Sequence, residues 1–319
     1  MKNTVLVTGG TGFVGIHTIL KLLTAGYQVH TTLRSLDKRN VIIDALKEAG
    51  IDRELEKLAF FEADLTSNVN WDAAMKGVTH VLHIASPFPA QDPADENELI
   101  IPARDGALRV LAAAGTAGVK RVVLTSSFAA VGYGIDVRDR KFTEADWTDV
   151  NADLPAYIKS KTVAEKAAWD FISNQTGPME LTVINPVGIF GPVIGGISSA
   201  SLDIAVSGIL NGTTKESPDF TMGVVDVRDV AALHIIAMDH PDAAGERFIA
   251  SSDGVMSFYD VASLFRNERP HWAAHIAEMQ PTPAAFYKQM SNDKAKNILG
   301  WLPKSKEEAL LASADSLMK

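Results

Sequence analysis

Short apolar runs alternate with longer amphipathic stretches through the first 190 residues of the chain. Runs such as Val81-Leu82-His83-Ile84 are apolar on both faces, which is typical of strands buried in a parallel sheet. We expect strands at Thr4–Thr8, Gln28–Leu33, Leu58–Glu62, His80–Ala85, Arg121–Ser126 and Leu181–Asn185. We expect helices between them at about Gly12–Ala25, Leu36–Ala49, Asn97–Ala117 and Ala156–Asn174. This alternation predicts an α/β fold with a doubly wound parallel sheet of the Rossmann type.

The pattern changes after Pro186, where glycines and prolines crowd residues 188–196. Helices are then expected near Ser201–Leu210, Ser257–Asn267, Ala284–Met290 and Lys306–Ser316. A strand and a helix over Val224–Asp239 and a strand at Glu246–Ala250 would return to the sheet. We therefore expect a Rossmann domain over residues 1–187 and 225–252. The smaller C-terminal lobe would take residues 188–224 and 253–319 and bind a substrate.

Composition narrows the choice of partners. The 319 residues carry a net charge of −9 with no basic stripe, which disfavours nucleic acid. There is no cysteine, which excludes disulfides and thiolate chemistry and fits a reducing compartment. We find no signal peptide and no apolar run long enough to span a membrane, and so expect a cytoplasmic protein. The histidines show no spacing typical of metal ligands, so no metal is expected.

The first expected strand runs directly into Gly9-Gly10-Thr11-Gly12-Phe13-Val14-Gly15. Glycine at positions 9, 12 and 15 would let the backbone approach a pyrophosphate, and the following helix would offer its free amides. A glycine-rich turn that only tightens a strand–helix connection is the alternative. Because the motif follows the first strand of a βαβ unit, we favour a dinucleotide site.

The end of the second expected strand indicates which dinucleotide binds. An acidic residue there would hold the ribose 2′-hydroxyl of NAD, whereas this strand runs into Arg34, with Lys38 four residues later. Two cations suit a 2′-phosphate, because guanidinium binds phosphate oxygens in a fork and lysine adds a point charge. Both could also be solvated surface cations. We favour NADP(H) over NAD.

A Tyr-x-x-x-Lys pair opens the helix expected at 156–174. Tyr157 and Lys161 are four residues apart and share one helix face, so the ammonium is expected to lower the pKa of the phenol. The fifth strand ends in Thr125-Ser126-Ser127, at the carboxyl edge where ligands bind such sheets. A serine there can donate to a carbonyl oxygen that becomes an alkoxide. We predict a catalytic set of Ser127, Tyr157 and Lys161, with Ser126 as the other candidate serine.

These motifs together resemble the extended short-chain dehydrogenases/reductases, and the resemblance covers nearly the whole chain. Within that superfamily the chain is most similar to the branch of dihydroflavonol 4-reductase and cinnamoyl-CoA reductase, which includes NADPH-dependent aldehyde, ketone and methylglyoxal reductases. The matching segments are Gly9–Gly15, Arg34 with Lys38, Asp64-Leu65, Ala85–Phe88, Thr125–Ser127, Tyr157–Phe171, Asn185–Pro192, Val225–Val230 and Asn297–Pro303.

The resemblance implies NADPH-dependent reduction of an aldehyde or ketone, with roles for particular residues. The cofactor would contact Gly9, Thr11, Gly12, Phe13, Val14, Arg34, Lys38, Asp64, Leu65, Ala85, Ser86, Pro87, Tyr157, Lys161, Pro186, Ile189 and Ser201. Of these, Asp64 and Leu65 would flank the adenine. Pro186 and Ile189 would lie near the nicotinamide, and Ser201 near a phosphate or ribose. Loop packing is the alternative for these last three.

One position departs from the plant dihydroflavonol reductases. Where they have an asparagine five residues after the catalytic serine, this chain has Gly132, which disfavours a flavonoid. Phe88 and Phe128 instead suggest a hydrophobic pocket for a small-molecule carbonyl substrate. Core packing is the alternative for both residues, and for Phe128 it is at least as good an explanation. A nucleotide-sugar epimerase or dehydratase is the alternative activity. A dinucleotide sensor without catalysis is a third possibility, disfavoured by the presence of Tyr157 with Lys161. The sequence leaves open whether the protein is a monomer or a homodimer.

Overall fold

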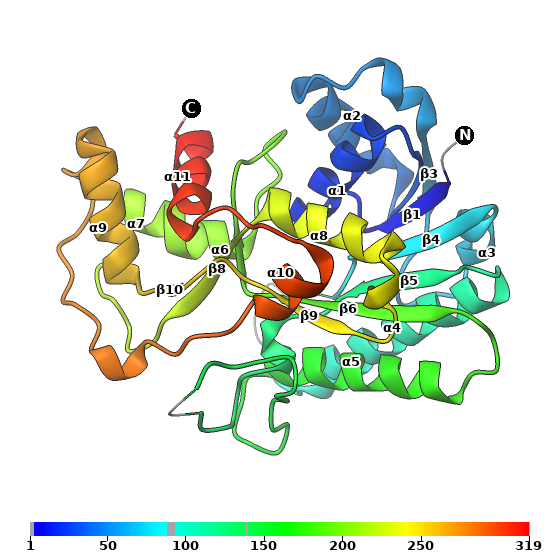
Figure 1. Cartoon of the computed structure of the whole chain (residues 1–319). Helices are drawn as coiled ribbons and strands as arrows, with labels where there is room; N and C mark the ends of the chain where they lie inside the picture. The colour runs from blue at the N-terminus through cyan, green and yellow to red at the C-terminus, as the bar shows by residue number, and fades with distance from the viewer. Residues whose placement is uncertain (1–2, 88–92, 138–139, 319) are drawn as a thin grey trace.

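The chain forms a seven-stranded parallel sheet covered by helices on both faces (Figure 1). The computed structural model describes residues 3–87, 93–137 and 140–318. The strand order is β3-β2-β1-β4-β5-β6-β9. The strands are β1 (Thr4–Thr8), β2 (Gln28–Leu33), β3 (Leu58–Glu62), β4 (Val78–His83), β5 (Arg121–Thr125), β6 (Glu180–Pro186) and β9 (Arg247–Ala250). Since neighbouring strands all run parallel, the predicted doubly wound Rossmann sheet is confirmed.

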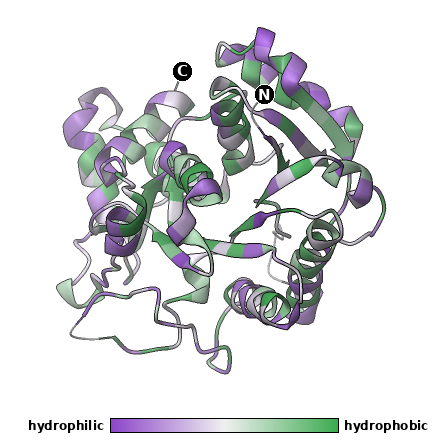
Figure 2. Ribbon diagram, turned by 45° about the vertical axis from the view of Figure 1, so that its right-hand side comes forward, coloured by the Kyte–Doolittle hydropathy of each residue, from purple (hydrophilic) through white to green (hydrophobic). Residues whose placement is uncertain are grey.

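Two groups of helices enclose the sheet. On one face α1 (Phe13–Thr24) packs against α8 (Val227–Asp239), with α2 (Arg39–Glu48) beside them. On the other face α4 (Asn97–Thr116) packs along α5 (Ala156–Asn174), next to the short α3 (Trp71–Met75). Central-strand residues Val5, Leu6 and Val7 are fully buried, which explains their continuous apolar run. Figure 2 shows the same division, with apolar residues toward the sheet and polar residues on outer helix faces.

A second group of elements lies beyond the carboxyl ends of the strands (Figure 1). It contains a small sheet in the order β10-β8-β7. Its strands are β7 (Gly188–Phe190), β8 (Met222–Asp226) and β10 (Val255–Met256). Its helices are α6 (Ala200–Leu202), a π-turn (Asp203–Ser207), α7 (Gly208–Leu210), α9 (Phe258–Glu268) and α11 (Lys306–Leu317). Helix α10 (Asp293–Leu299) packs instead along the edge strand β9 (Figure 1).

The prediction of a helix over Ala284–Met290 is wrong beyond the first turn of that segment. Only Ala284–Phe286 coils, as a 3-10 turn, and Met290 pairs with Phe142 in an isolated parallel bridge. The amide of Phe142 donates to the carbonyl oxygen of Gln289, and the amide of Ser291 donates to that of Phe142. A distant loop thus draws this segment into an extended conformation, against its local preference.

Candidate active site

The glycine-rich loop joins β1 to α1 and has no room for larger side chains. Gly9 adopts a positive φ of 74°, and a Cβ on Gly15 would collide with the Gly9 carbonyl oxygen. Gly12 occupies the cap position of α1, which begins at the buried Phe13 without a side-chain cap. The first amides of α1 are therefore left for a ligand, as a pyrophosphate site requires.

The predicted phosphate corner lies at the ends of β2 and β3. Arg34 is exposed directly after β2, and Lys38 is exposed at the end of a 3-10 turn (Leu36–Lys38). Asp64, after β3, accepts hydrogen bonds from the Thr66 amide and hydroxyl, at 2.7 and 2.6 Å. These bonds, and more weakly Arg34, lower the pKa of the Asp64 carboxyl. Both cations are thus presented to solvent beside the loop after β3, as a 2′-phosphate would need.

The loop after β4 is fixed by Thr8 at the end of β1. Its hydroxyl accepts hydrogen bonds from the amides of Ile84 and Ala85, each at 3.0 Å, and lies 2.8 Å from His83 Nδ1. Because both lone pairs are used, the Thr8 proton goes to Nδ1, and His83 carries its proton on Nε2. Burial lowers the pKa of His83 to about 3, which keeps the ring neutral. This contact also explains why β4 ends at His83 rather than at the expected Ala85.

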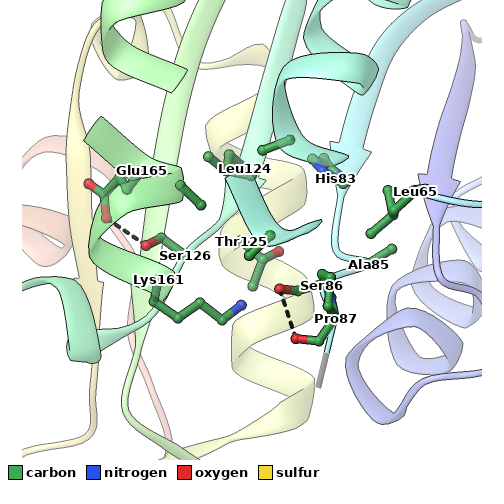
Figure 3. A pocket seen from close by; sticks show the side chains of 13 residues that line it. Leu65, His83, Ala85, Ser86, Pro87, Leu124, Thr125, Ser126, Lys161 and Glu165 are labelled. Atoms are coloured by element: carbon green, nitrogen blue, oxygen red, sulfur yellow. Dashed lines mark hydrogen bonds between the residues drawn. The ribbon is translucent and has the colours of Figure 1, made fainter. Parts of the chain in front are cut away.

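Lys161 extends from α5 into a small hollow beside this loop (Figure 3). The hollow gathers the predicted cofactor residues Leu65, Ala85, Ser86 and Pro87 around Lys161. Lys161 is buried, and burial lowers the pKa of its ammonium to about 8, against a smaller opposite effect of Glu165. The loops after β3 and β4 therefore meet the Tyr–Lys helix at one cavity.

Tyr157 and Ser127 meet at the start of α5 and the end of β5. The Ser127 side chain hydrogen-bonds the Tyr157 phenol, and the Lys161 Nζ atom lies 5.8 Å from the centre of the Tyr157 ring. The structure thus brings the three predicted catalytic residues together. The expectation that Lys161 lowers the pKa of Tyr157 is wrong for this structure, because burial raises that pKa and outweighs the opposite effect of the Ser127 bond. Tyr157 is consequently protonated at neutral pH.

The neighbouring serine has a different partner. The hydroxyl of Ser126 donates to Glu165 Oε2 at 2.6 Å, and both residues line the hollow together with Lys161 (Figure 3). Ser127 is therefore the serine that faces Tyr157. Sequence reasoning missed Glu165, although an acidic residue four positions after Lys161, on the buried side of an amphipathic helix, is a usable signal.

The remaining predicted cofactor residues lie further along the chain. Pro186 ends β6 and is buried, Ile189 is the middle residue of β7, and Ser201 is half-buried in α6. None of these three is among the described residues that line the hollow at Lys161. Phe88, predicted to contact substrate, lies outside the described residues.

Phe128 belongs to an aromatic cluster. Its ring stands edge-on to Phe142 at 5.5 Å and to Tyr133 at 6.2 Å. A Cβ on Gly132 would lie 2.5 Å from the end of the Phe128 ring. The glycine that replaces the plant asparagine is thus the residue that this packing accommodates. Tyr133 is 41% exposed, and the surrounding protein raises the pKa of its phenol by desolvation.

The described parts of the chain contain neither a candidate metal site nor a helix that could span a membrane. No three histidine, aspartate or glutamate side chains there form a group able to hold a metal ion. None of the described helices combines the length and apolar character needed to cross a bilayer.

The chain is similar in sequence and in structure to known reductases. A cinnamoyl-CoA reductase of Medicago truncatula is 32% identical to the chain over 93% of its length and 90% of the relative's. A Candida albicans protein provisionally named an NADPH-dependent methylglyoxal reductase is 34% identical over 94% of both chains. The solved structure of the yeast methylglyoxal/isovaleraldehyde reductase Gre2, complexed with NADPH, superposes with a TM-score of 0.87 at 28% identity. It covers 99% of this chain and 98% of that one.

The sequence profile of the NAD dependent epimerase/dehydratase family matches residues 5–250. That range runs from β1 through β9 and so includes the whole seven-stranded sheet, the glycine loop and the Tyr–Lys helix. The protein is accordingly a member of the NAD dependent epimerase/dehydratase family, the extended short-chain dehydrogenases/reductases.

Proposed function

We propose that this protein reduces an aldehyde or ketone to an alcohol with NADPH, using Tyr157 as the general acid. The observation that carries the proposal is the hydrogen bond between Ser127 and Tyr157 beside the buried Lys161. A phenol in hydrogen-bond contact with a hydroxyl, with an ammonium 5.8 Å from the phenol ring, can bind a carbonyl oxygen and give it a proton.

Three features support NADPH as the cofactor. The glycine loop packs closely on the start of α1, since a Cβ on Gly15 would collide with the Gly9 carbonyl oxygen, and the first amides of α1 have no side-chain cap and are left for a pyrophosphate. Arg34 and Lys38 are both exposed where a 2′-phosphate would lie. The yeast relative was solved with NADPH, and the Candida relative is named for it. When bound, NADPH would supply a hydride to the carbonyl carbon.

The chain's own residues would transfer the proton to the carbonyl oxygen. Tyr157 is protonated at neutral pH because burial raises its pKa, so it can donate to the oxygen of the forming alkoxide. The Ser127 hydroxyl can donate a second hydrogen bond to that oxygen. The phenolate that remains would be next to the ammonium of Lys161, whose positive charge favours it. Lys161 also extends into the hollow where the nicotinamide ribose would bind.

The two predicted parts of the chain would bind different ligands, one the cofactor and the other the substrate. In this proposal residues 1–187 and 225–252 hold most of the cofactor, with Pro186 and Ile189 near the nicotinamide and Ser201 near a cofactor phosphate or ribose. Residues 188–224 and 253–319 close over the substrate. The exposed Tyr133 and the half-buried Phe128 would form part of the substrate side.

The test is NADPH oxidation by the purified protein with a panel of aldehydes, ketones, diketones and a dihydroflavonol, alongside a UDP-hexose. We expect turnover with small carbonyl compounds and none with the dihydroflavonol. Conversion of the UDP-hexose, with every carbonyl compound inert, would overturn the proposal in favour of a sugar-nucleotide epimerase or dehydratase.

A further inference from the structure

Glu165 is a buried carboxylate that the proposed proton transfer does not use. It lies on α5 one turn after Lys161 and is 0% exposed. A carboxylate is rarely buried this completely unless it is paired, because removing its charge from water is costly. Its contacts therefore indicate what it stabilises.

One carboxylate oxygen of Glu165 ties together the strands that carry the proposed site. Its Oε2 atom accepts hydrogen bonds from Ser126 Oγ at 2.6 Å and from Asn185 Nδ2 at 2.7 Å. Asn185 Nδ2 also donates to the Ser127 carbonyl oxygen at 3.1 Å. Glu165 thus holds the residue before Ser127 directly and the Ser127 backbone through one amide.

The other oxygen is neutralised from β9. Glu165 Oε1 lies 2.7 Å from Arg247 Nε, and Trp169 Nε1 donates to it at 3.3 Å. Arg247 Nε is not aligned for a hydrogen bond, so the contact is an ion pair. The guanidinium lies 3.7 Å from the centre of the Trp147 ring, which fixes its position by a cation–π contact. Glu165 therefore has a permanent cation partner that is independent of Lys161.

Glu165 also acts on Lys161. The titratable groups that face Lys161 are Tyr157 and Glu165 on α5 and His83 at the end of β4, and His83 is neutral. Burial lowers the pKa of Lys161, and Glu165 is the group that opposes this effect. Without the carboxylate, burial would act on the ammonium unopposed.

We propose that Glu165 is a positioning residue that holds Ser127 in place through Ser126 and Asn185 and that, one helix turn from Lys161 at the same hollow, stabilises the Lys161 ammonium. The role rests on the proposed function, in which Ser127 and Lys161 assist Tyr157. It assigns no chemical step to Glu165.

The test measures Lys161 directly, without turnover. In protein carrying carbon-13 at lysine Cε, the Lys161 resonance is assigned by its loss in Lys161→Met and titrated in wild type and in Glu165→Gln. We expect the midpoint in Glu165→Gln to fall by about one pH unit. The alkaline limb of the NADPH-oxidation profile should shift in the same direction. Glu165→Asp, which keeps the charge, should restore the wild-type midpoint.

Two further variants make the result decisive. Asp170→Asn removes an exposed carboxylate from the same helix and should leave the midpoint unchanged. Glu165→Gln leaves Arg247 unpaired and could unfold, so the double variant Glu165→Gln/Arg247→Met, which removes both charges, is titrated as well. Its Lys161 midpoint should also fall, but by less than in Glu165→Gln, because the repulsion between Arg247 and the ammonium is removed as well. An unchanged Lys161 midpoint in either folded variant would overturn the proposal. Wild-type protein inert toward every carbonyl would instead refute the proposed function.

Discussion

The Ser127 hydroxyl and the Tyr157 phenol form a hydrogen bond between the end of β5 and the first turn of α5. The two residues are 30 positions apart, and the bond exists because parallel strands end at the same sheet edge, where α5 begins. Ser126, one residue earlier, points to Glu165 instead. The direction of two adjacent side chains therefore decides which serine can assist the phenol.

Replacement of the two serines tests this relationship. Ser127→Ala should lower kcat by about 10²-fold, because a donor to the developing alkoxide is lost, while NADPH affinity stays within twofold. Ser126→Ala should lower kcat at least tenfold less than this, because the Ser126 hydroxyl is bonded to Glu165 and not to Tyr157. Steady-state rates and NADPH fluorescence titrations measure both quantities. A larger loss in Ser126→Ala would reverse the assignment of the working serine.

Arg34→Ala tests cofactor choice. A charge-assisted contact to the 2′-phosphate is worth enough to lower kcat/KM for NADPH by about 10- to 100-fold, whereas NADH has no such phosphate. The matched control is Arg53→Ala, which removes an exposed arginine from the 3-10 turn before β3. It should change neither value. Equal losses with both cofactors in Arg34→Ala would refute the phosphate role.

Gly132→Asn tests the packing of Phe128. Since a Cβ at position 132 would lie 2.5 Å from the ring, we expect a destabilisation of about 1–3 kcal/mol. Thermal unfolding should show a lowered Tm, and Phe128→Ala in the same chain should recover part of the loss by making room. If Gly132→Asn unfolds at the wild-type temperature, the ring moves freely and the steric account fails.

Lys161→Met should make the protein more stable and less active. The pKa of Lys161 is lowered from 10.5 to about 8 on folding, so the folded state binds its proton more weakly than the unfolded state. This costs stability fully below about pH 8, and the cost disappears as pH rises from about 8 to 10.5. A shift of this size corresponds to about 3 kcal/mol. Thermal unfolding across pH should show the Tm advantage of Lys161→Met at pH 7 shrinking above pH 8; an advantage independent of pH would have another cause.

The sequence predicts those features of the fold that depend on residues close together in the chain, and it fails for those that depend on distant contacts. The glycine loop, with Gly15 against Gly9, needs only neighbouring residues, and the seven strands follow from their buried runs. The extended segment at Met290 depends on Phe142, 148 positions away, and so could not be predicted from its own residues.

In the candidate site, too, local spacing could be predicted from the sequence and long-range contacts could not. The four-residue spacing places Tyr157 and Lys161 on one helix face, but the pKa of Tyr157 is set mainly by burial under the whole fold. The role of Glu165 needs Arg247, which comes from β9 and is distant in the sequence.

The most direct test of the central claim is the Tyr157→Phe variant. The substitution removes the phenol hydroxyl and its proton and keeps the ring, so the fold and the cofactor site should persist. Stopped-flow NADPH oxidation with the best aldehyde of the panel should be at least about 10³-fold slower than in wild type, with NADPH affinity unchanged. An undiminished rate in Tyr157→Phe would contradict the assignment of Tyr157 as the general acid.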